Sequence, residues 1–488
     1  MQAGKIAGGS DGPSQARTSY RRWWWVAAAL AAGALLRLWF ILHLPYLSDD
    51  SLMYGGFAKN LVEHGVYGFS AAANGSTTGT IRPSLIRLPG YPLFLALCFR
   101  IFGVEHYVSV MGVQAAIDLG TCLLIAGLAR RVFGQRAGWA ALWLSALCPF
   151  TANYVSAVLS ETLTVFMLAL AFFALERWQA HDGSGFNRWL YAIAFALGYG
   201  ILLRPEQGLV AATVIPAMVW MRLRRHGLQS FWQTILPVVA VALLTLLPLL
   251  PWTVRNWRTF GVFQPLAPRF ATDPGESNPA GFQRWYRTWG VDYASTEQVY
   301  WNYDGANISI GDLPDRAFDS DAQYHETDEL LNDYNQTNSA TPEFDQRFNA
   351  IAHQRIANDP LRYYVELPLA RLVNMMFRPR DYMLPWPLEW WKFRLHPGQT
   401  IEATLYALLN MAYFVLAGAA LWLRRRWAWG KPLVLAMLGS ILLRSLLLLT
   451  LDNSEMRYTL EFFPVLIVFA AVNFSYPHGK NPMQRRRV

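Results

Sequence analysis

The chain has 488 residues, of which 53% are hydrophobic and only 15% are charged. Soluble domains are about one quarter charged, so this composition excludes an ordinary soluble protein and indicates a membrane protein. The formal net charge is +9, but the basic residues stand in short clusters between apolar runs. That pattern is typical of cytoplasmic loops, and it argues against a nucleic-acid partner.

Apolar runs bounded by charged or Gly/Pro-rich breaks recur along the whole chain. Because about twenty apolar residues cross the ~30 Å of hydrocarbon in a bilayer, each run predicts a membrane-spanning helix. The predicted spans are 24–43, 107–129, 137–153, 158–176, 189–203, 207–222, 233–252, 403–423, 432–450 and 458–474. We therefore expect an all-α integral membrane protein with about ten transmembrane helices.

The charges of the loops predict which side of the membrane each loop occupies. With the N-terminus inside, the basic clusters fall on the cytoplasmic side. The long outer segment is rich in Trp, Tyr and Asn and exceeds the length of a simple connection, so we expect a small periplasmic subdomain there. The predicted regions are a cytoplasmic tail 1–22, a membrane module 23–253 with a first outer loop 44–106, the outer segment 254–402, C-terminal helices 403–474 and a cytoplasmic tail 475–488.

The ionisable residues that look out of place in a membrane protein all map to the outer side. Embedded charges are costly, and they usually face one another or a polar cavity. One cavity of mixed charge at the outer face is therefore predicted. Its candidate members are Asp49, Asp50, Arg82, Arg87, Glu161, Arg204, Glu206, Arg255, Glu455 and Arg457.

Each candidate also has a structural interpretation. Asp49 and Asp50 suit an N-cap pair for an amphipathic helix that follows them in the outer loop. Glu161 suits a first-turn charge on its own span. Arg87 suits an interfacial arginine that snorkels to lipid headgroups, and Arg37 within the first span is more easily read as a snorkelling residue than as a ligand.

Carboxylates and arginines together suit one kind of chemistry. A carboxylate deprotonates an incoming hydroxyl, while guanidinium groups bind a phosphate and stabilise it as it leaves. A lipid-linked sugar fits such a cavity at headgroup depth. No zinc spacing is present, and the acidic stretch 312–333 lacks the calcium-loop pattern. No cofactor is required, and a divalent metal has no specific support.

Five stretches together resemble a known family. "DSLMYGGFAKNL" carries Asp50, Tyr54, Ala58 and Leu61 at helical spacing, and it is followed by "RLPGYPLFLAL", "LSETLTVF", "PWTVRNWRTFGVFQPL" and "EMRYTLEFFPVLIVFAA". In this order they resemble the membrane glycosyltransferases of the GT-C fold. The bacterial branch related to protein O-mannosyltransferases and to the lipid A aminoarabinose transferase is the most similar.

The resemblance implies a polyprenyl-phosphate sugar donor and a hydroxyl acceptor, with transfer that inverts the anomeric centre. It also implies a multi-pass protein of the bacterial inner membrane whose active site faces the periplasm. The acceptor is left open between lipid A, another glycan and a protein. A transporter or flippase of lipid-linked sugars is the alternative, and it would be expected to show symmetric repeats and midplane charges.

The resemblance also implies roles for individual residues. Asp50 corresponds to the catalytic aspartate, and Asp49 is an extra acid that leaves the register ambiguous by one residue. The residues expected to bind the donor phosphate are Arg87, Arg255, Arg457 and Arg82. The residues expected to orient the substrates are Glu161, Tyr54, Tyr91 and Glu455.

Overall fold

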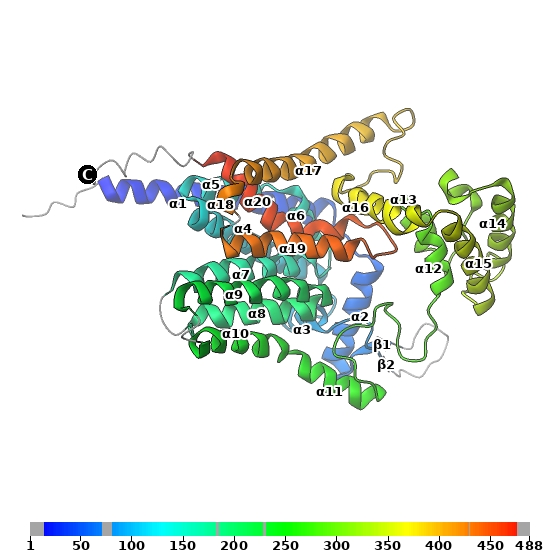
Figure 1. Ribbon diagram of the computed structural model, residues 1–488, viewed down its shortest axis with the longest axis horizontal. Coiled ribbons are helices and arrows are strands. Elements are labelled where there is room, and N and C mark those ends of the chain that lie inside the picture. Colours follow the sequence, from blue (N-terminus) through cyan, green and yellow to red (C-terminus); the bar gives the residue numbers. More distant parts are fainter. Residues whose placement is uncertain (1–13, 71–80, 182–184, 228–230, 429, 476–488) are drawn as a thin grey trace, which may run out of the picture.

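The structure is a computed structural model that describes residues 14–70, 81–181, 185–227, 231–428 and 430–475. Helices form an elongated bundle, and a smaller group of helices stands at one end of it (Figure 1). Within the described residues, six helical segments are long and apolar enough to cross a membrane. They cover Trp23–His43, Tyr107–Phe133, Glu161–Ala180, Phe231–Phe260, Pro397–Leu423 and Met456–Phe474. The chain is therefore a multi-pass membrane protein.

Three further apolar helices are shorter, namely α3 (Gly90–Phe102), α8 (Arg188–Leu203) and α19 (Pro432–Leu448). The predicted span 137–153 is divided into α5 (Gln135–Ala146) and α6 (Pro149–Asn153). Proline lacks an N–H and favours the first turn of a helix, so α6 begins as a new helix at Pro149. The count of ten spans stays a prediction.

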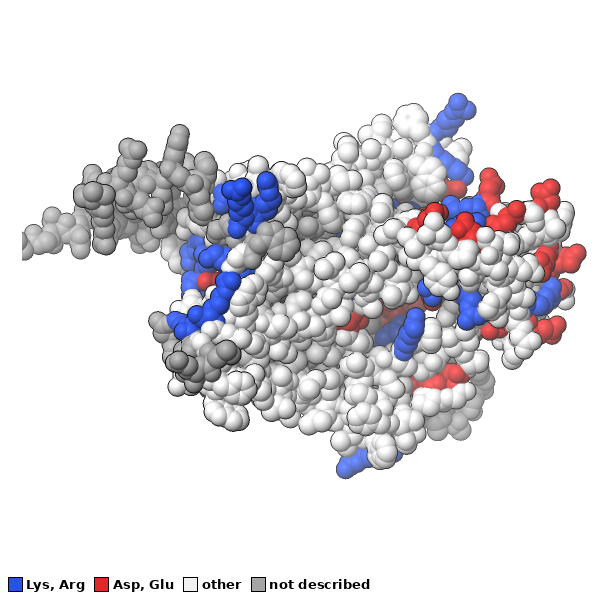
Figure 2. All heavy atoms as spheres, in the orientation of Figure 1, with Lys and Arg blue, Asp and Glu red and all other residues white. Residues whose placement is uncertain are grey.

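The bundle packs around α7 (Glu161–Ala180), which is buried on most sides. Other helices of the bundle are α1 (Ser14–His43), α4 (Tyr107–Phe133), α9 (Gly208–His226), α10 (Phe231–Leu246), α11 (Leu249–Phe260), α17 (Pro397–Leu423) and α20 (Phe463–Ala470). On the face in Figure 2, charged side chains gather toward the two ends and the broad middle of the bundle is nearly free of them. Such an apolar belt is what a bilayer requires.

Arg37 does not snorkel. Its side chain is fully buried between α1 and α4, where Nε and Nη2 donate to Asp118 Oδ2 at 2.8 and 2.5 Å. Nη1 donates to the carbonyl oxygens of Gly33 and Ala146, each at 2.8 Å. The interpretation of Arg37 as a snorkelling residue was wrong, because Asp118 offers a partner inside the bundle that the sequence pattern did not connect to it.

The first outer loop contains α2 (Asp49–His64) and a two-stranded antiparallel ribbon of β1 (Gly68–Ser70) and β2 (Ile81–Pro83). This ribbon is a small addition to the predicted all-α fold. Ser48 is the N-cap of α2, and it forms a capping box with Ser51. Asp49 and Asp50 therefore lie in the first turn rather than at the cap, so the N-cap interpretation was wrong.

The outer segment has a hydrophobic core of its own. Helices α12 (Ala280–Arg287), α14 (Asp321–Tyr334) and α15 (Pro342–Asn358) surround it, and its largest members are Phe282, Trp285, Tyr286, Trp289, Tyr334 and Phe348. Asp345 Oδ1 accepts the backbone N–H groups of Gly281 and Phe282 at 2.7 and 3.0 Å, which caps α12. A Cβ at Gly281 would meet the Asp345 carbonyl oxygen at 2.0 Å, so this contact requires glycine.

The chain returns from this core through α16 (Leu367–Phe377) to the bundle. Several contacts join the outer segment to the loop before the last membrane helix; for example, Ser454 N donates to Thr296 Oγ1 at 3.1 Å, and Arg287 pairs with Asp452 at 3.3 Å. That loop leads directly to Glu455 and Arg457. The outer segment therefore holds one wall of the charged cavity described below.

Candidate active site

A cavity of 590 Å³ lies where α2 meets the N-terminal ends of α7 and α9. Its apolar lining includes Leu88, Leu203 and Leu448. Its charged lining comes from the first outer loop, α7, the α8–α9 connection, the outer segment, α19 and the last outer loop. Its ionisable members are Asp50, Arg87, Glu161, Arg204, Glu206, Arg269, Arg444 and Arg457. Seven of the predicted residues thus meet in one place: Asp50, Tyr54, Arg87, Glu161, Arg204, Glu206 and Arg457.

Asp50 lies between two arginines. Its Oδ1 accepts from Arg87 Nη2 at 3.2 Å, and its Oδ2 pairs with Arg457 Nη2 at 2.9 Å. Burial would raise the pKa of Asp50, but the charges and hydrogen bonds of Arg457 and Arg87 outweigh it and hold that pKa below its ordinary value. The carboxylate is therefore ionised at neutral pH and able to accept a proton.

Asp49 has different surroundings. Its side chain is exposed, and it neither lines the cavity nor forms an ion pair within the part of the chain that the structure describes. Successive residues of a helix project about 100° apart, so only one of the two adjacent aspartates can face the arginines. The geometry favours the register in which Asp50 is the functional acid.

The charged wall continues from Arg457 as an alternating series of acids and bases. Glu455, fully buried, pairs with Arg457 Nε, while Glu161 Oε1 accepts from Arg204 Nη1 at 3.0 Å and lies 3.9 Å from Arg457 Nε. Glu206 then bridges Arg204 and Arg444, and Arg444 also pairs with Glu461. The corresponding distances are 2.9 Å for Arg204–Glu206, 3.1 Å for Arg444–Glu206 and 3.3 Å for Arg444–Glu461.

The arginines of this series compensate the burial of its carboxylates to different extents. Burial raises the pKa of Glu206, but the charges of Arg204 and Arg444 lower it to about 2. Burial also raises the pKa of Glu455, and in that case the charge of Arg457 does not bring it back to its ordinary value. The wall therefore holds buried carboxylates whose pKa values are shifted in opposite directions.

Glu161 has one oxygen that points to a ligand. Its Oε2 is buried and has no hydrogen-bond partner among the described residues. The segment that precedes it is fixed by Gln114 Nε2, which donates to the carbonyl oxygens of Val155 and Ala157 at 3.1 and 2.7 Å. Buried carboxylate oxygens are normally hydrogen-bonded, so Glu161 Oε2 is suited to accept a substrate hydroxyl.

The two predicted tyrosines lie in successive layers. Tyr54 lines the cavity, and burial raises its pKa above the ordinary value. Tyr91 lies behind it, fully buried, in edge-to-face contact at 5.2 Å between ring centres. Tyr91 Oη donates to Gln114 Oε1 at 2.8 Å, so it supports the segment that leads to Glu161 instead of facing the cavity.

Arg82 and Arg255 are not brought into the cavity. Arg82 is 57% exposed and pairs with Glu276 at 2.6 Å. Arg255 donates to the carbonyl oxygens of Ser84 and Tyr67, each at 2.7 Å, and its guanidinium lies over the rings of Tyr67, Trp252 and Phe260. It joins α11 to the ribbon that precedes Arg87, and it acts on the site only through that backbone.

Three members of the site escaped sequence reasoning. Arg444 and Glu461 lie inside predicted spans, where a lone ionisable residue in an apolar run is itself a signal of function. Arg269 lies on a loop of the outer segment, lines the cavity and is exposed. Nothing in the local sequence around Arg269 distinguishes it from an ordinary surface arginine.

Metal ligation has little geometric support. Among the described residues there is no group of three or more His, Cys, Asp or Glu side chains placed to hold a metal ion. Asp50, Glu161 and Glu206 each face two arginines. The absence of a metal requirement stays a prediction.

Comparison with known proteins now bears on this geometry. Residues 83–252 match the family model described as dolichyl-phosphate-mannose-protein mannosyltransferase. The oligosaccharyltransferase of Archaeoglobus fulgidus, solved with a tethered acceptor peptide, aligns with a TM-score of 0.50 and 14% identity over 93% of this chain and 50% of that chain. The chain is similar to the GT-C glycosyltransferases. The resemblance that the sequence indicated is confirmed.

A second structural neighbour of this chain is ArnT from Cupriavidus metallidurans, solved with undecaprenyl phosphate. It aligns with a TM-score of 0.39 and 14% identity over 92% of this chain and 77% of that chain. No curated protein matches the sequence. The chain spans about half the length of the archaeal oligosaccharyltransferase chain (50%), so that likeness concerns the fold. The matched family segment contains Arg87, Glu161 and Arg204, whereas Asp50 and Arg457 lie outside it.

Proposed function

We propose that this chain is an inverting glycosyltransferase that moves a single sugar from a polyprenyl-phosphate donor to an acceptor hydroxyl. The observation that carries the proposal is the position of Asp50 in the cavity wall, 3.2 Å from Arg87 and 2.9 Å from Arg457. A proton acceptor and two guanidinium groups, of which Arg87 is a candidate for binding the phosphate, thus lie side by side in the cavity. The description of the matched family, which names a dolichyl-phosphate sugar, supports the same class of donor.

The cavity suits an amphiphilic substrate. Its apolar wall accommodates the first isoprenoid units of a polyprenyl chain, and its arginines accommodate the phosphate. Arg87, which is partly exposed, and Arg269, which forms no ion pair with the described residues, are the candidates for direct phosphate contact. Arg457 is engaged by Asp50 and Glu455 and serves mainly to hold Asp50 in place.

The reaction is a single displacement. The acceptor oxygen attacks the anomeric carbon from the face opposite the phosphate, and the bond between that carbon and the phosphate oxygen breaks. The acceptor proton passes to Asp50, and the polyprenyl phosphate leaves as an anion stabilised by arginine. General-base assistance of this kind contributes roughly 10²- to 10⁴-fold to the rate.

Glu161 is proposed to orient a sugar. Its Oε1 is fixed by Arg204, and its Oε2 is buried without a partner among the described residues. A hydroxyl of the donor sugar or of the acceptor would satisfy that oxygen. Tyr54, which lies beside Asp50 on α2, forms the adjoining wall.

The location and the acceptor belong to the same proposal. Loop charges favour a site on the periplasmic face of a bacterial inner membrane. The acceptor is a hydroxyl of the cell envelope, either on lipid A, on another glycan or on a protein. The proposed location and the proposed acceptor are argued from the topology and from the resemblance. Neither is argued from a feature of the cavity.

The proposal is tested by product analysis. Membranes that contain the wild type, Asp50→Asn or Asp49→Asn are supplied with an extract of polyprenyl-phosphate sugars, and lipids and glycans are compared by mass spectrometry. We expect one added sugar with the wild type and with Asp49→Asn, and none with Asp50→Asn. Full activity of Asp50→Asn would refute the catalytic role, and movement of intact lipid-linked sugar between leaflets without any product would establish transport instead.

A further inference from the structure

A second cavity lies at the opposite end of two helices that form the candidate active site. Helix α7 begins at Glu161 in the charged cavity and ends at Ala180, and α9 begins at Gly208 in the same cavity and ends at His226. Where they end, Trp178, Gly185, Met221, Arg222, Arg224 and Arg225 line a pocket of 260 Å³. This pocket belongs to neither the proposed reaction nor the outer segment.

The distance between the two cavities follows from helix geometry. A helix of 20 residues such as α7 is about 30 Å long, which equals the hydrocarbon thickness of a bilayer. If one end of α7 lies at the headgroups of one leaflet, its other end lies at the headgroups of the other. Exposed aromatic residues near the second pocket support this depth, because Phe186, Phe231 and the 74% exposed Trp232 have the character of an interfacial belt.

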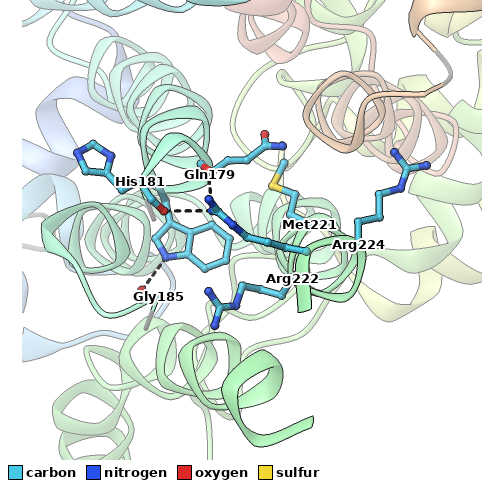
Figure 3. A pocket seen from close by; sticks show the side chains of 8 residues that line it. Gln179, His181, Gly185, Met221, Arg222 and Arg224 are labelled. Carbon is cyan, nitrogen blue, oxygen red and sulfur yellow. Dashed lines mark hydrogen bonds between the residues drawn. The ribbon is translucent and has the colours of Figure 1, made fainter. Parts of the chain in front are cut away.

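The pocket wall is built from fixed groups. Arg225 Nη1 donates to the carbonyl oxygens of Gln179 and His181 at 3.4 and 3.2 Å, as the dashed lines in Figure 3 indicate. Arg222 donates to the Gln233 carbonyl oxygen, and Trp178 Nε1 donates to the Gly185 carbonyl oxygen at 2.7 Å. Backbone carbonyls at helix ends thus hold guanidinium groups in defined positions around a hollow.

Arg224 completes the basic wall from the other side. It projects from the same helix as Arg222 but in a different direction (Figure 3), and it donates to the Gly430 carbonyl oxygen at 2.8 Å. The guanidinium also lies over the ring of Trp220 at 4.4 Å. Planar, multiply donating guanidinium groups match the geometry of phosphate oxygens.

We propose that this pocket binds a phosphate group, carried by a phospholipid headgroup of the leaflet opposite the candidate active site. The volume admits a phosphate and the first atoms attached to it. The depth argument favours a lipid over free phosphate as the source. Arginine clusters at this end of a membrane bundle also satisfy the positive-inside rule without binding anything, and the experiment separates these cases.

The experiment uses the purified full-length chain in detergent. Native mass spectrometry counts bound lipids while phosphatidylglycerol or phosphatidylcholine is titrated, and a third arm adds inorganic phosphate. The variants are Arg222→Gln and Arg224→Gln, with Arg222→Lys as the charge-conserving form. Arg188→Gln is the matched control, because Arg188 is exposed at the same end of the bundle and stacks on Trp189 without lining the pocket.

We expect the wild type and Arg188→Gln to retain at least one phosphatidylglycerol in preference to phosphatidylcholine. Affinity for that lipid should fall about tenfold in Arg222→Gln and in Arg224→Gln, which corresponds to one lost charge-assisted contact, and Arg222→Lys should recover part of it. Displacement of the lipid by millimolar inorganic phosphate would overturn the lipid as the source. Unchanged affinity in both glutamine variants, or an equal fall in Arg188→Gln, would overturn the phosphate site.

Discussion

Two of the buried ion-pair sites among the described residues differ in how their charges are shared. Arg37 and Asp118 form a closed pair, in which one guanidinium satisfies one carboxylate and two backbone carbonyls, and neither residue lines the cavity of the candidate active site. In the candidate active site Asp50, Glu161 and Glu206 each face two arginines, and all three line a cavity of 590 Å³.

The difference separates structural charge from chemical charge. A closed buried pair offers nothing to a ligand, and removing one partner leaves an uncompensated charge. A shared network allows one contact to be exchanged for a substrate group while each acid keeps another partner. The same residue types therefore stabilise the bundle in one region and are suited to bind and react in the other.

The largest effect on stability is expected for Arg37→Leu. Asp118 would remain buried without its cation, at a cost of roughly 3–5 kcal/mol in the free energy of unfolding. Thermal unfolding in detergent, together with the yield of monodisperse protein, measures the loss. The double variant Arg37→Leu/Asp118→Leu should regain most of the stability, because both charges are gone. A double variant no more stable than the single one would show that the site needs polar groups for another reason.

A smaller stability effect with a large catalytic effect is expected for Arg204→Met. Glu161 keeps Arg457 at 3.9 Å and Glu206 keeps Arg444 at 3.1 Å, so no carboxylate is left without a cation. Glu161 nevertheless loses the 3.0 Å contact that orients it, and the rate of transfer should fall roughly 10²-fold. Initial rates and unfolding are measured on the same preparation. A stability loss equal to that of Arg37→Leu with an unchanged rate would make the network structural.

The pH dependence of transfer tests the arginines around Asp50. In the proposed reaction the ionised carboxylate of Asp50 accepts the proton, so activity should fall as the pH drops through the pKa of Asp50. Arg457 and Arg87 lower that pKa, which places the acid limb of kcat/KM below the ordinary range of an aspartate. In Arg87→Gln one cation is removed, the pKa of Asp50 rises, and the acid limb should move to higher pH. An acid limb that stays in place would assign the titration to another group.

Much of this architecture was accessible from the sequence. Apolar runs located the membrane helices, and loop charge grouped Asp50, Arg87, Glu161 and Arg457 on one face before any contact was known. Periodicity and charge patterns succeed here because the bilayer imposes length and polarity on each segment. The resemblance then placed Asp50 ahead of Asp49 by its register with Tyr54.

The remaining features depend on contacts between distant residues. Arg37 meets Asp118 across two helices, and Arg255 meets the backbone of Tyr67 and Ser84. No local pattern encodes such pairings, so Arg37 was misread and Arg255 was expected in the cavity. Arg444 was missed for a different reason. Helix α19 is apolar, so its segment was taken as an ordinary span and the ionisable residue within it was not considered as a site residue.

Arg82 gives the smallest expected effect and marks the boundary of the candidate site. Its pair with Glu276 is 2.6 Å long but exposed, and exposed pairs contribute at most about 1 kcal/mol. Arg82→Gln should therefore change the free energy of unfolding only slightly and leave the KM for the lipid-linked donor unchanged. The sequence predicts that Arg82 binds the donor phosphate, whereas the structure places it outside the cavity. The KM of Arg82→Gln therefore decides between these two positions. A severalfold rise in KM with an unaltered kcat would extend the donor site beyond the cavity, along the ribbon of β1 and β2, and would restore Arg82 to it.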